Sequence, residues 1–401
     1  MFSTVVLKKF EKIKTPFYYY DLSLLKKTLH VLTSSAGKFG FIVHYALKAN
    51  ANKKILHEIK NAGIGADCVS GNEIKEALAS GFKPGSVAFA GVGKTDEEII
   101  YALNKNIFCF NCESQQEIEV INALAGKTGR TARVALRINP DINPNTHHYI
   151  TTGLEENKFG INKGDLENVL KLLQKSKNIK LTGIHYHIGS QITDLSSFKS
   201  LCIKSNEIQH WLNKRNVFIE HINVGGGLGV DYHHPEKNMI PDFESYFKMF
   251  HDFLELQKNQ KLHFELGRSV AAQCGALVSR ALFIKKGVQT NFLILDAGMT
   301  ELIRPALYQA YHKIENISAE VLRKSESKTN KGKTLKSGDE NQIKYDVVGP
   351  ICESSDCFGK GIMLPETKRG DLIAIRTAGA YGEVMSSTYN LRKKVKAYFG
   401  K

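Results

Sequence analysis

FIVHYALKAN, residues 41–50, is the stretch of sequence that decides the fold. Its β-branched and aromatic residues predict a buried strand, which Lys48 and the small residues behind it close in a turn. Lys48 would then lie at the mouth of a buried strand, where desolvation favours a neutral, nucleophilic amine. Such an amine can bond to an aldehyde, as pyridoxal phosphate requires. A lysine that merely extends from a strand end into water gives the same local pattern.

Further apolar runs, each ended by a turn signal, follow this one, and amphipathic segments separate them. The eight predicted strands are 41–47, 64–69, 86–90, 107–111, 133–139, 181–188, 221–224 and 262–266. The helices predicted between them include 72–79, 96–103, 114–125, 166–175, 196–213 and 243–257. Strands that are apolar on both faces and alternate with helices predict parallel βαβ units. Eight such units close into a TIM (β/α)8 barrel of roughly 250 residues.

The pattern changes after about residue 272 to β-rich stretches separated by Gly and Pro turns, which predicts a second domain made of sheet. Its predicted strands are 276–283, 291–295, 345–348, 372–377 and 393–398. The first residues of the chain do not fit the barrel count. We therefore assign 28–272 to the barrel, and 1–27 with 273–401 to a discontinuous β-sandwich or β-barrel-like domain.

The net charge of +15 is concentrated in two short segments. Residues 323–344 hold seven basic and three acidic residues, and residues 392–401 hold five basic and no acidic ones. The first segment has no aromatic residue on which a base could stack. Its composition predicts a mobile, solvated basic insertion. We expect no nucleic-acid partner.

The compartment follows from two further features. No apolar run approaches the ~18 residues that span a bilayer, and the start, MFSTVVL, is too short and wrongly flanked for a secretory signal. The seven cysteines are an odd number, which fits a reduced compartment better than a disulfide framework. We expect a cytoplasmic protein with no membrane partner.

The chemistry of a TIM barrel lies at the C-terminal ends of its strands, and several predicted ends carry polar residues or glycines. These are Lys48, Asp67, His185 with His187 and Ser190, then Gly225, Gly226 and Gly227, and finally Glu265 with Arg268. The three glycines would let backbone amides approach a phosphate. Their spacing does not match G-x-G-x-x-G, so a dinucleotide site is rejected.

Glu265 is a buried carboxylate that needs a cation nearby. A pyridinium nitrogen would serve, and the pairing would keep the ring protonated as an electron sink. An internal salt bridge to Arg268 accounts for this carboxylate nearly as well. His185 and His187 share one strand face and could bind a metal, but no Asp ends strand eight to complete a hydrolytic site. We therefore predict no metal, and one histidine ring stacked on a planar cofactor.

Eight motifs together resemble the diaminopimelate decarboxylase family of lysine biosynthesis, within the fold-type III enzymes that include alanine racemase and ornithine decarboxylase. They lie at residues 45–50, 65–67, 187–190, 225–227, 265–268, 296–299, 352–356 and 379–382. The resemblance covers nearly the whole chain, and it implies a TIM barrel followed by a β-domain that also takes in the N-terminal segment. The implied cofactor is pyridoxal 5'-phosphate.

For the cofactor, the resemblance implies that Lys48 forms the covalent link, His187 stacks on the ring and Glu265 pairs with the pyridine nitrogen. Asp67 belongs to the same cofactor site. The phosphate is placed near Ser190, Gly225, Gly226, Gly227 and Tyr381.

For the substrate, the resemblance implies an amino acid whose carboxylate is held by Arg268, Arg304 and Tyr308, with Tyr381 and Glu353 also at the binding site. Cys352 and Glu353 would reach the neighbouring subunit's site across a head-to-tail homodimer, with Cys352 a candidate proton donor.

The expected reaction is decarboxylation of meso-2,6-diaminopimelate to L-lysine and CO2. An ornithine- or arginine-type decarboxylase is the nearest alternative, but Arg304 favours a substrate with a distal carboxylate. A racemase is disfavoured because in related racemases an arginine takes the place of Glu265. A non-catalytic pyridoxal-phosphate protein would not need Arg304, Tyr308, Cys352 and Glu353, and a metal-dependent barrel hydrolase would not need Lys48.

Overall fold

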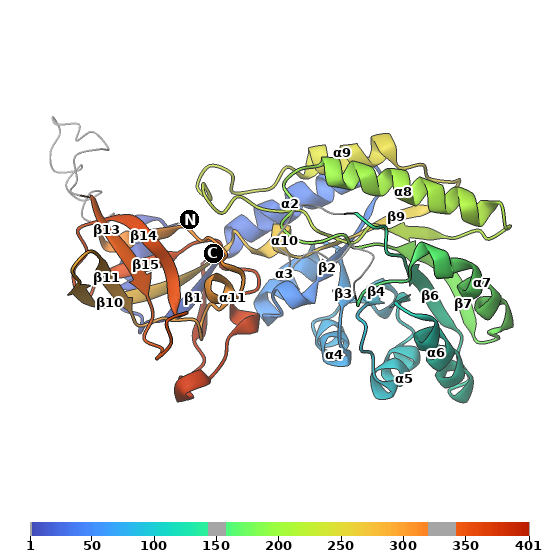
Figure 1. The fold of residues 1–401 in the computed structure, drawn as a ribbon, viewed down its shortest axis with the longest axis horizontal. Helices are drawn as coiled ribbons and strands as arrows, with labels where there is room; N and C mark the ends of the chain where they lie inside the picture. Colours follow the sequence, from blue (N-terminus) through green and yellow to red (C-terminus); the bar gives the residue numbers. More distant parts are fainter. Residues whose placement is uncertain (1, 143–157, 320–341, 401) are drawn as a thin grey trace. The chain divides into compact units, whose positions relative to one another are not determined.

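The protein is described by a computed structural model covering residues 2–142, 158–319 and 342–400 (Figure 1). The chain divides into two compact units. The barrel unit comprises residues 26–230 and 241–270, and the sheet unit comprises residues 1–25, 231–240 and 271–401. The domain limits predicted from the sequence, 28–272 for the barrel and 1–27 with 273–401 for the second domain, refer to independently folding segments. They stay a prediction.

The barrel unit contains eight parallel strands that close into a barrel in chain order. They are β2 (Ile42–Ala46), β3 (Gly65–Cys68), β4 (Val87–Phe89), β5 (Cys109–Cys112), β6 (Ala132–Arg137), β7 (Ile179–His185), β8 (His221–Asn223) and β9 (Lys261–Leu266). The barrel is closed by pairing of β2 with β9, in a register that places His44 opposite Glu265. The predicted TIM barrel is confirmed, and each predicted strand coincides with an observed one to within a few residues.

Helices lie around the outside of these strands (Figure 1). They are α2 (Leu22–Lys38), α3 (Lys53–Asn61), α4 (Gly71–Ala79), α5 (Asp96–Lys105), α6 (Gln115–Lys127), α7 (Leu166–Lys175), α8 (Ser196–Asn213) and α9 (Phe243–Phe253). Local sequence fixes several of their starts: the Ser70 side chain caps α4, and Thr95 with Glu98 forms a capping box on α5. Helix α9 ends four residues before the predicted limit, because Leu254 adopts an extended backbone.

The sheet unit is built on an eight-stranded sheet. Its strands are β1 (Phe17–Asp21), β10 (Gly275–Lys286), β11 (Asn291–Leu295), β12 (Ile314–Asn316), β13 (Gln342–Val348), β14 (Cys357–Pro365), β15 (Leu372–Ile375) and β16 (Lys396–Gly400). The main path runs β12-β15-β10-β11-β13-β14. Strand β1 lies between β10, to which it is antiparallel, and β16, to which it is parallel. The predicted β-rich second domain is confirmed.

One detail of the predicted basic insertion is wrong. Gln342, Ile343 and Lys344 form the start of β13, where they pair with β14. Residues 323–341 of that insertion, and residues 143–157, lie outside the described part of the chain. The remaining helices are α1 (Thr4–Phe10), α10 (Arg268–Ala271) and α11 (Arg304–Tyr308).

The barrel interior contains three buried histidines, His44, His221 and His263, which pack around Phe108. His44 Nδ1 lies 3.1 Å from the Ser86 carbonyl oxygen, and its Nε2 lies 2.8 Å from His263 Nδ1. Because a carbonyl only accepts, His44 carries its hydrogen on Nδ1 and accepts from His263 at Nε2. Both ring nitrogens of His221 lack a hydrogen-bond partner among the described residues.

Burial lowers the pKa values of all three histidines. The pKa of His221 falls to about 3 and that of His263 to about 2, and the pKa of His44 is also lowered. These rings stay neutral in the folded protein at pH values where the unfolded chain, with a pKa near 6.5, takes up protons. Their contribution to stability is therefore constant above about pH 6.5 and falls as the pH drops below it. His221 and His263 therefore each remove about 2 kcal/mol of unfolding free energy between pH 7.5 and 5.

We predict that His221→Leu makes the protein less sensitive to acid, because one proton-binding group of the unfolded state is removed. Urea unfolding at pH 7.5 and pH 5.0 measures the change, as a smaller loss of unfolding free energy than in the unmodified protein. The exposed His30 provides the control, since His30→Leu should leave the loss unchanged. An equal loss in all three proteins would contradict the account.

Candidate active site

The C-terminal end of the barrel brings Lys48 close to Asp67. Lys48 lies in a short 3-10 turn, Leu47–Ala49, directly after β2, and Asp67 lies on the neighbouring strand β3. Lys48 Nζ is 3.8 Å from Asp67 Oδ2. The Asp67 side chain is fully buried, whereas the Lys48 side chain is 38% exposed. The amine is thus at the strand mouth as predicted, but less desolvated than the sequence pattern suggested.

Glu265, near the end of β9, is held by side chains from three other strands. His185 Nε2 lies 2.9 Å from Glu265 Oε2, while Asn111 and Asn223 donate to Oε1 at 3.0 and 2.7 Å. Burial opposes ionisation of this carboxyl, but His185, followed by Lys48, holds its pKa well below the usual value. Glu265 is therefore an ionised carboxylate inside the barrel.

Arg268 is not the partner of Glu265 that the salt-bridge alternative required. Its Nε and Nη2 donate to Ser190 Oγ at 3.2 and 3.0 Å. The sequence did correctly group Arg268 and Ser190 near the same end of the barrel. It did not predict that the two residues contact each other.

The three glycines after β8 form a turn that fits tightly against its neighbours. Gly225 and Gly227 have φ values of +70° and +113°, which a side chain would strain. A Cβ on Gly226 would overlap the Glu265 carbonyl oxygen. The Gly226 N–H donates to His187 Nδ1 at 3.2 Å, so the turn also orients this ring.

The orientation of His187 defines its protonation. Because Nδ1 accepts a hydrogen bond, the neutral ring carries its hydrogen on Nε2. The pKa of His187 lies well below its usual value. Burial is the larger cause, and the positive charge of Lys48 is the second. A neutral, planar ring is what the predicted stacking role requires, and that role stays a prediction.

The charges at this end of the barrel fit pyridoxal phosphate. Burial and the charge of Glu265 raise the pKa of Asp67 well above its usual value, and Lys48 offsets only part of this effect. Neither oxygen of Asp67 accepts a hydrogen bond from the residues described. Two buried carboxyl groups thus lie where nearby positive charge offsets the effect of burial on Asp67 only in part, so the site favours a further positive charge. A protonated pyridine ring would supply it.

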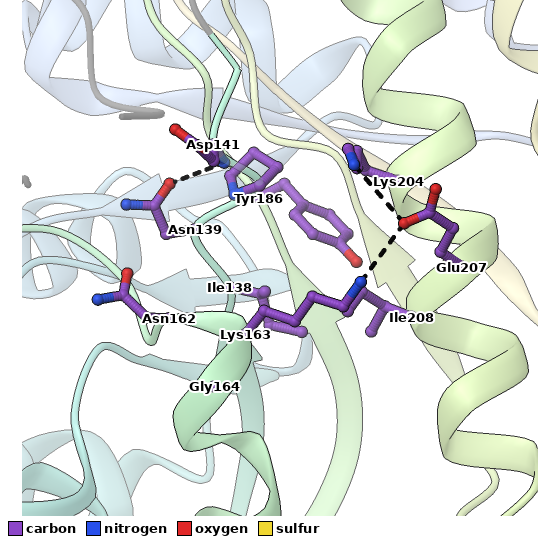
Figure 2. Close-up of a pocket in the computed structure, with 11 residues that line it drawn as sticks. Ile138, Asn139, Asp141, Asn162, Lys163, Gly164, Tyr186, Lys204, Glu207 and Ile208 are labelled. Carbon is purple, nitrogen blue, oxygen red and sulfur yellow. Dashed lines mark hydrogen bonds and ion pairs between the residues drawn. The ribbon is translucent and has the colours of Figure 1, made fainter. Parts of the chain in front are cut away.

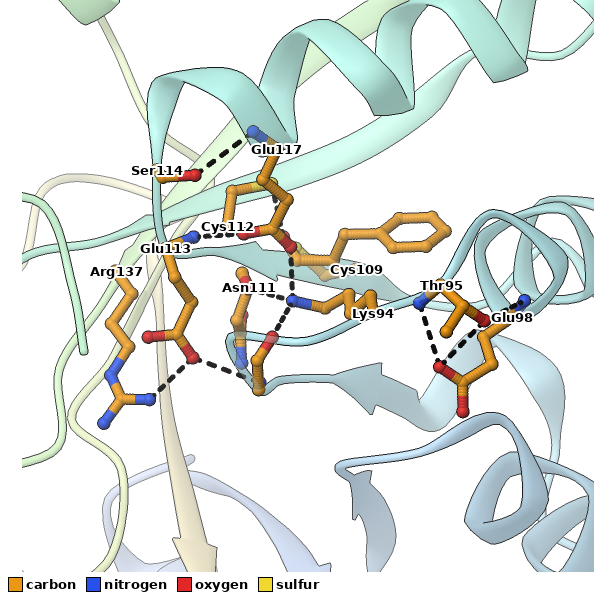
Figure 3. Close-up of polar contacts among 12 residues, drawn as sticks. Lys94, Thr95, Glu98, Cys109, Asn111, Cys112, Glu113, Ser114, Glu117 and Arg137 are labelled. Atoms are coloured by element: carbon orange, nitrogen blue, oxygen red, sulfur yellow. Dashed lines mark hydrogen bonds and ion pairs between the residues drawn. The ribbon is translucent and has the colours of Figure 1, made fainter. Parts of the chain in front are cut away.

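A buried ion pair between Arg137 and Glu113 lies next to the site, where β5 and β6 end (Figure 3). Arg137 at the end of β6 donates to Glu113 at 2.7 Å, and both side chains are buried. Glu113 also accepts from the backbone N–H groups of Gly91 and Gly160. These contacts fix Arg137, whose charge lowers the pKa of both Asp67 and His187.

The comparisons with known proteins decide the family. Residues 25–272 match the family described as pyridoxal-dependent decarboxylase, pyridoxal binding domain. The chain is 53% identical to the diaminopimelate decarboxylase of Bacteroides thetaiotaomicron, with 98% of this chain and 97% of that protein covered. The chain belongs to the diaminopimelate decarboxylase family of pyridoxal-dependent enzymes. Its cofactor is pyridoxal phosphate.

Other relatives of this family agree. The diaminopimelate decarboxylase of Vibrio cholerae is 40% identical, covering 95% of this chain and 86% of that protein. The crystal structure of diaminopimelate decarboxylase from Helicobacter pylori complexed with L-lysine has a TM-score of 0.87 at 37% identity, covering 98% and 93% of the two chains. An arginine decarboxylase of Paramecium bursaria Chlorella virus has a TM-score of 0.84 at 19% identity and 99% and 100% coverage, which shows a shared fold alone.

The other residues that the family resemblance singled out belong to the sheet unit. Arg304 begins helix α11 and is buried, whereas Tyr308, at its end, and Tyr381 are partly buried. Cys352 and Glu353 are exposed in a turn between β13 and β14. The functional roles given to these five residues stay predictions.

Sequence reasoning missed several residues that hold the site together. Asn111, Asn223, Glu113 and Arg137 were given no role, and His185 was considered as a metal ligand or a stacking ring but not as a partner of Glu265. A usable signal was present, because Asn111, Asn223 and Arg137 are polar residues at or near the C-terminal ends of buried strands. No cluster of three or more His, Cys, Asp or Glu side chains in the described ranges is arranged to hold a metal ion.

A cavity of about 230 Å³ lies near the ends of β6 and β7, beside α8 (Figure 2). Tyr186, Lys163 and Glu207 are among its lining residues, and none of the predicted site residues lines it. Tyr186 alternates with His185 and His187, so its side chain faces the helical layer rather than the barrel interior. The cavity is therefore separate from the group around Glu265.

None of the helices within the described ranges is long and apolar enough to cross a membrane.

We predict that Glu265→Gln retains the cofactor but slows decarboxylation by roughly 100-fold or more, because a neutral amide cannot stabilise a positive ring nitrogen. Absorbance of the bound cofactor and single-turnover rates separate the two effects. Glu220→Gln, at an exposed carboxylate of the same unit, is the matched control. A Glu265→Gln protein with full cofactor content and an unchanged rate would exclude this role.

Proposed function

We propose that this protein decarboxylates meso-2,6-diaminopimelate to L-lysine and CO2, the last step of lysine biosynthesis. The observation that carries the proposal is the 53% identity to a diaminopimelate decarboxylase over 98% of the chain, which includes the sheet unit as well as the barrel. The arginine decarboxylase likeness, at 19% identity, supports the fold and not the substrate.

The barrel residues have distinct proposed tasks. Lys48 would form the covalent link to the cofactor aldehyde, and Asp67, whose Oδ2 lies 3.8 Å from Lys48 Nζ, belongs to the same cofactor site. Glu265 would pair with the pyridine nitrogen of the cofactor, and His187 would stack on its ring. Ser190 with the turn formed by Gly225, Gly226 and Gly227 holds the phosphate, together with Tyr381. Bound pyridoxal phosphate supplies the electron sink that makes loss of CO2 possible.

The substrate is proposed to be held by its carboxylate groups. Arg268, Arg304 and Tyr308 bind carboxylate, with Tyr381 and Glu353 also in the binding site. One carbon–carbon bond breaks, CO2 leaves, and a proton is added at the same carbon. Cys352 is the proposed donor of this proton.

We also propose a cytoplasmic homodimer with shared active sites. The supporting observation is that Cys352 and Glu353 are exposed, although both are reactive groups in a turn between two strands. A second subunit would cover them and use them. This arrangement makes the catalytic site incomplete in a single chain.

The reaction itself is tested with Lys48→Ala. We expect this variant to lose the visible absorbance of the bound cofactor and nearly all turnover, because the amine that forms the link is removed. Borohydride reduction of the unmodified protein followed by peptide mapping should label Lys48, and product analysis with meso-diaminopimelate should yield lysine and CO2. Turnover of ornithine or arginine in place of diaminopimelate would reject the proposed substrate.

The shared site is tested by mixing Lys48→Ala protein with Glu353→Ala protein, each inactive alone. Hybrid dimers would contain one intact site, so activity should rise as subunits exchange, to about a quarter of the normal value at equal mixing. A mixture of Lys48→Ala with Glu265→Gln is the control, since both residues lie in one barrel and no intact site can form. If hybrids form without regaining activity, Glu353 acts within its own chain.

A further inference from the structure

The sheet unit contains a buried hydrogen-bonded group around Arg304 that the reaction scheme leaves unexplained. Arg304 Nη1 donates to Tyr232 Oη at 2.9 Å and to His312 Nε2 at 2.8 Å. All three side chains are at most 7% exposed. Both hydrogens of one terminal nitrogen are thus used to hold the guanidinium inside the protein.

The hydrogen bond on the other side of His312 defines its tautomer. His312 Nδ1 lies 2.8 Å from the carbonyl oxygen of Arg376, which can only accept. The ring therefore carries its hydrogen on Nδ1, and Nε2 presents a lone pair to Arg304. A protonated ring would place a second N–H group against the guanidinium, so the arrangement requires neutral His312.

The carbonyl that selects this tautomer is itself fixed by the sheet. Arg376 follows β15, and its backbone N–H donates to the Lys313 carbonyl at 2.8 Å, next to the pairing of β12 with β15. The Arg376 side chain also donates to Glu315 on β12 at 2.7 Å. Strand pairing thus orients a carbonyl, the carbonyl sets the tautomer of His312, and His312 orients Arg304.

The ring of Tyr232 completes the arrangement. It packs edge-on against His312, with ring centres 5.1 Å apart and planes at 80°, and the Arg304 guanidinium carbon lies 5.0 Å from the Tyr232 ring centre. The guanidinium is therefore restrained by two hydrogen bonds and one aromatic face. Such restraint suits an arginine that must present its remaining N–H groups in one direction, because a carboxylate is bound best by a fixed, planar donor pair.

We propose that His312 and Tyr232 are positioning residues that orient Arg304 for the substrate carboxylate that is not lost, and so set specificity for a substrate with a distal carboxylate. This inference rests on the proposed function, in which Arg304 binds carboxylate. The retained carboxylate is still present in L-lysine and is missing from 1,5-diaminopentane. The Arg304 group therefore distinguishes these two compounds.

The test uses steady-state kinetics and competitive inhibition of the holoenzyme. His312→Leu should raise KM for meso-diaminopimelate by roughly tenfold to a hundredfold with a much smaller change in kcat, because a hydrogen bond to a charged group is lost. The preference for L-lysine over 1,5-diaminopentane as an inhibitor should fall by the same factor. His312→Gln, whose side-chain oxygen can replace Nε2 as acceptor, should recover most of the preference.

Two further variants make the outcome decisive. Tyr232→Phe keeps the ring and removes only the hydroxyl, so it should reduce the preference even if His312→Leu folds poorly. His234→Leu, at an exposed neighbour of Tyr232, should behave like the unmodified enzyme. Equal loss of affinity for both inhibitors would show a merely structural role, and an unchanged KM in His312→Leu and Tyr232→Phe would overturn the inference. Absence of diaminopimelate turnover in the unmodified enzyme would instead reject the proposed function.

Discussion

The structure depends on keeping one carboxylate, Glu265, ionised inside a protein barrel. An unpaired buried charge of this kind would cost several kcal/mol. Here the cost is offset by His185 and by the amides of Asn111 and Asn223, each from a different strand. The charge can persist only if the barrel closes in one register, because a shift of a strand by one residue would turn its polar side chain outward. The site and the fold therefore constrain each other.

The charge of the side chains inside the barrel changes along the barrel axis. His263 lies two residues before Glu265 on the same strand face, and it joins His44 and His221 in a group that stays neutral. Glu265 and Asp67 lie nearer the C-terminal ends, where Lys48 provides positive charge. Polar groups thus fill much of the space that aliphatic layers fill in a typical TIM barrel. Net charge is confined to the end where a cofactor with its own charge can balance it.

The barrel was predictable because its signals are local. Apolar runs such as β2, ended by small residues, show both the strand and its limit, and caps such as Thr95 with Glu98 fix the helix starts. Strand β14 was missed because Gly359 and Gly361 interrupt its pattern and most of its residues are only partly buried. In the site, Lys48 and Glu265 were found from their strand ends. The bond between Arg268 and Ser190 was not, since it joins residues 78 positions apart and depends on how the strands are arranged.

The position of β1 affects how the protein folds during its synthesis on the ribosome. This strand, made within the first 21 residues, lies between β10 and β16, and β16 contains residues 396–400. The barrel strands are all synthesised by residue 266, so the barrel can form while the rest of the chain is still being made. Strand β1 must instead wait for residues 396–400 to emerge before its pairing with β16 is complete. Contacts of such long sequence separation form slowly, and until then the edge of this tyrosine-rich strand that pairs with β16 stays open and needs protection from aggregation.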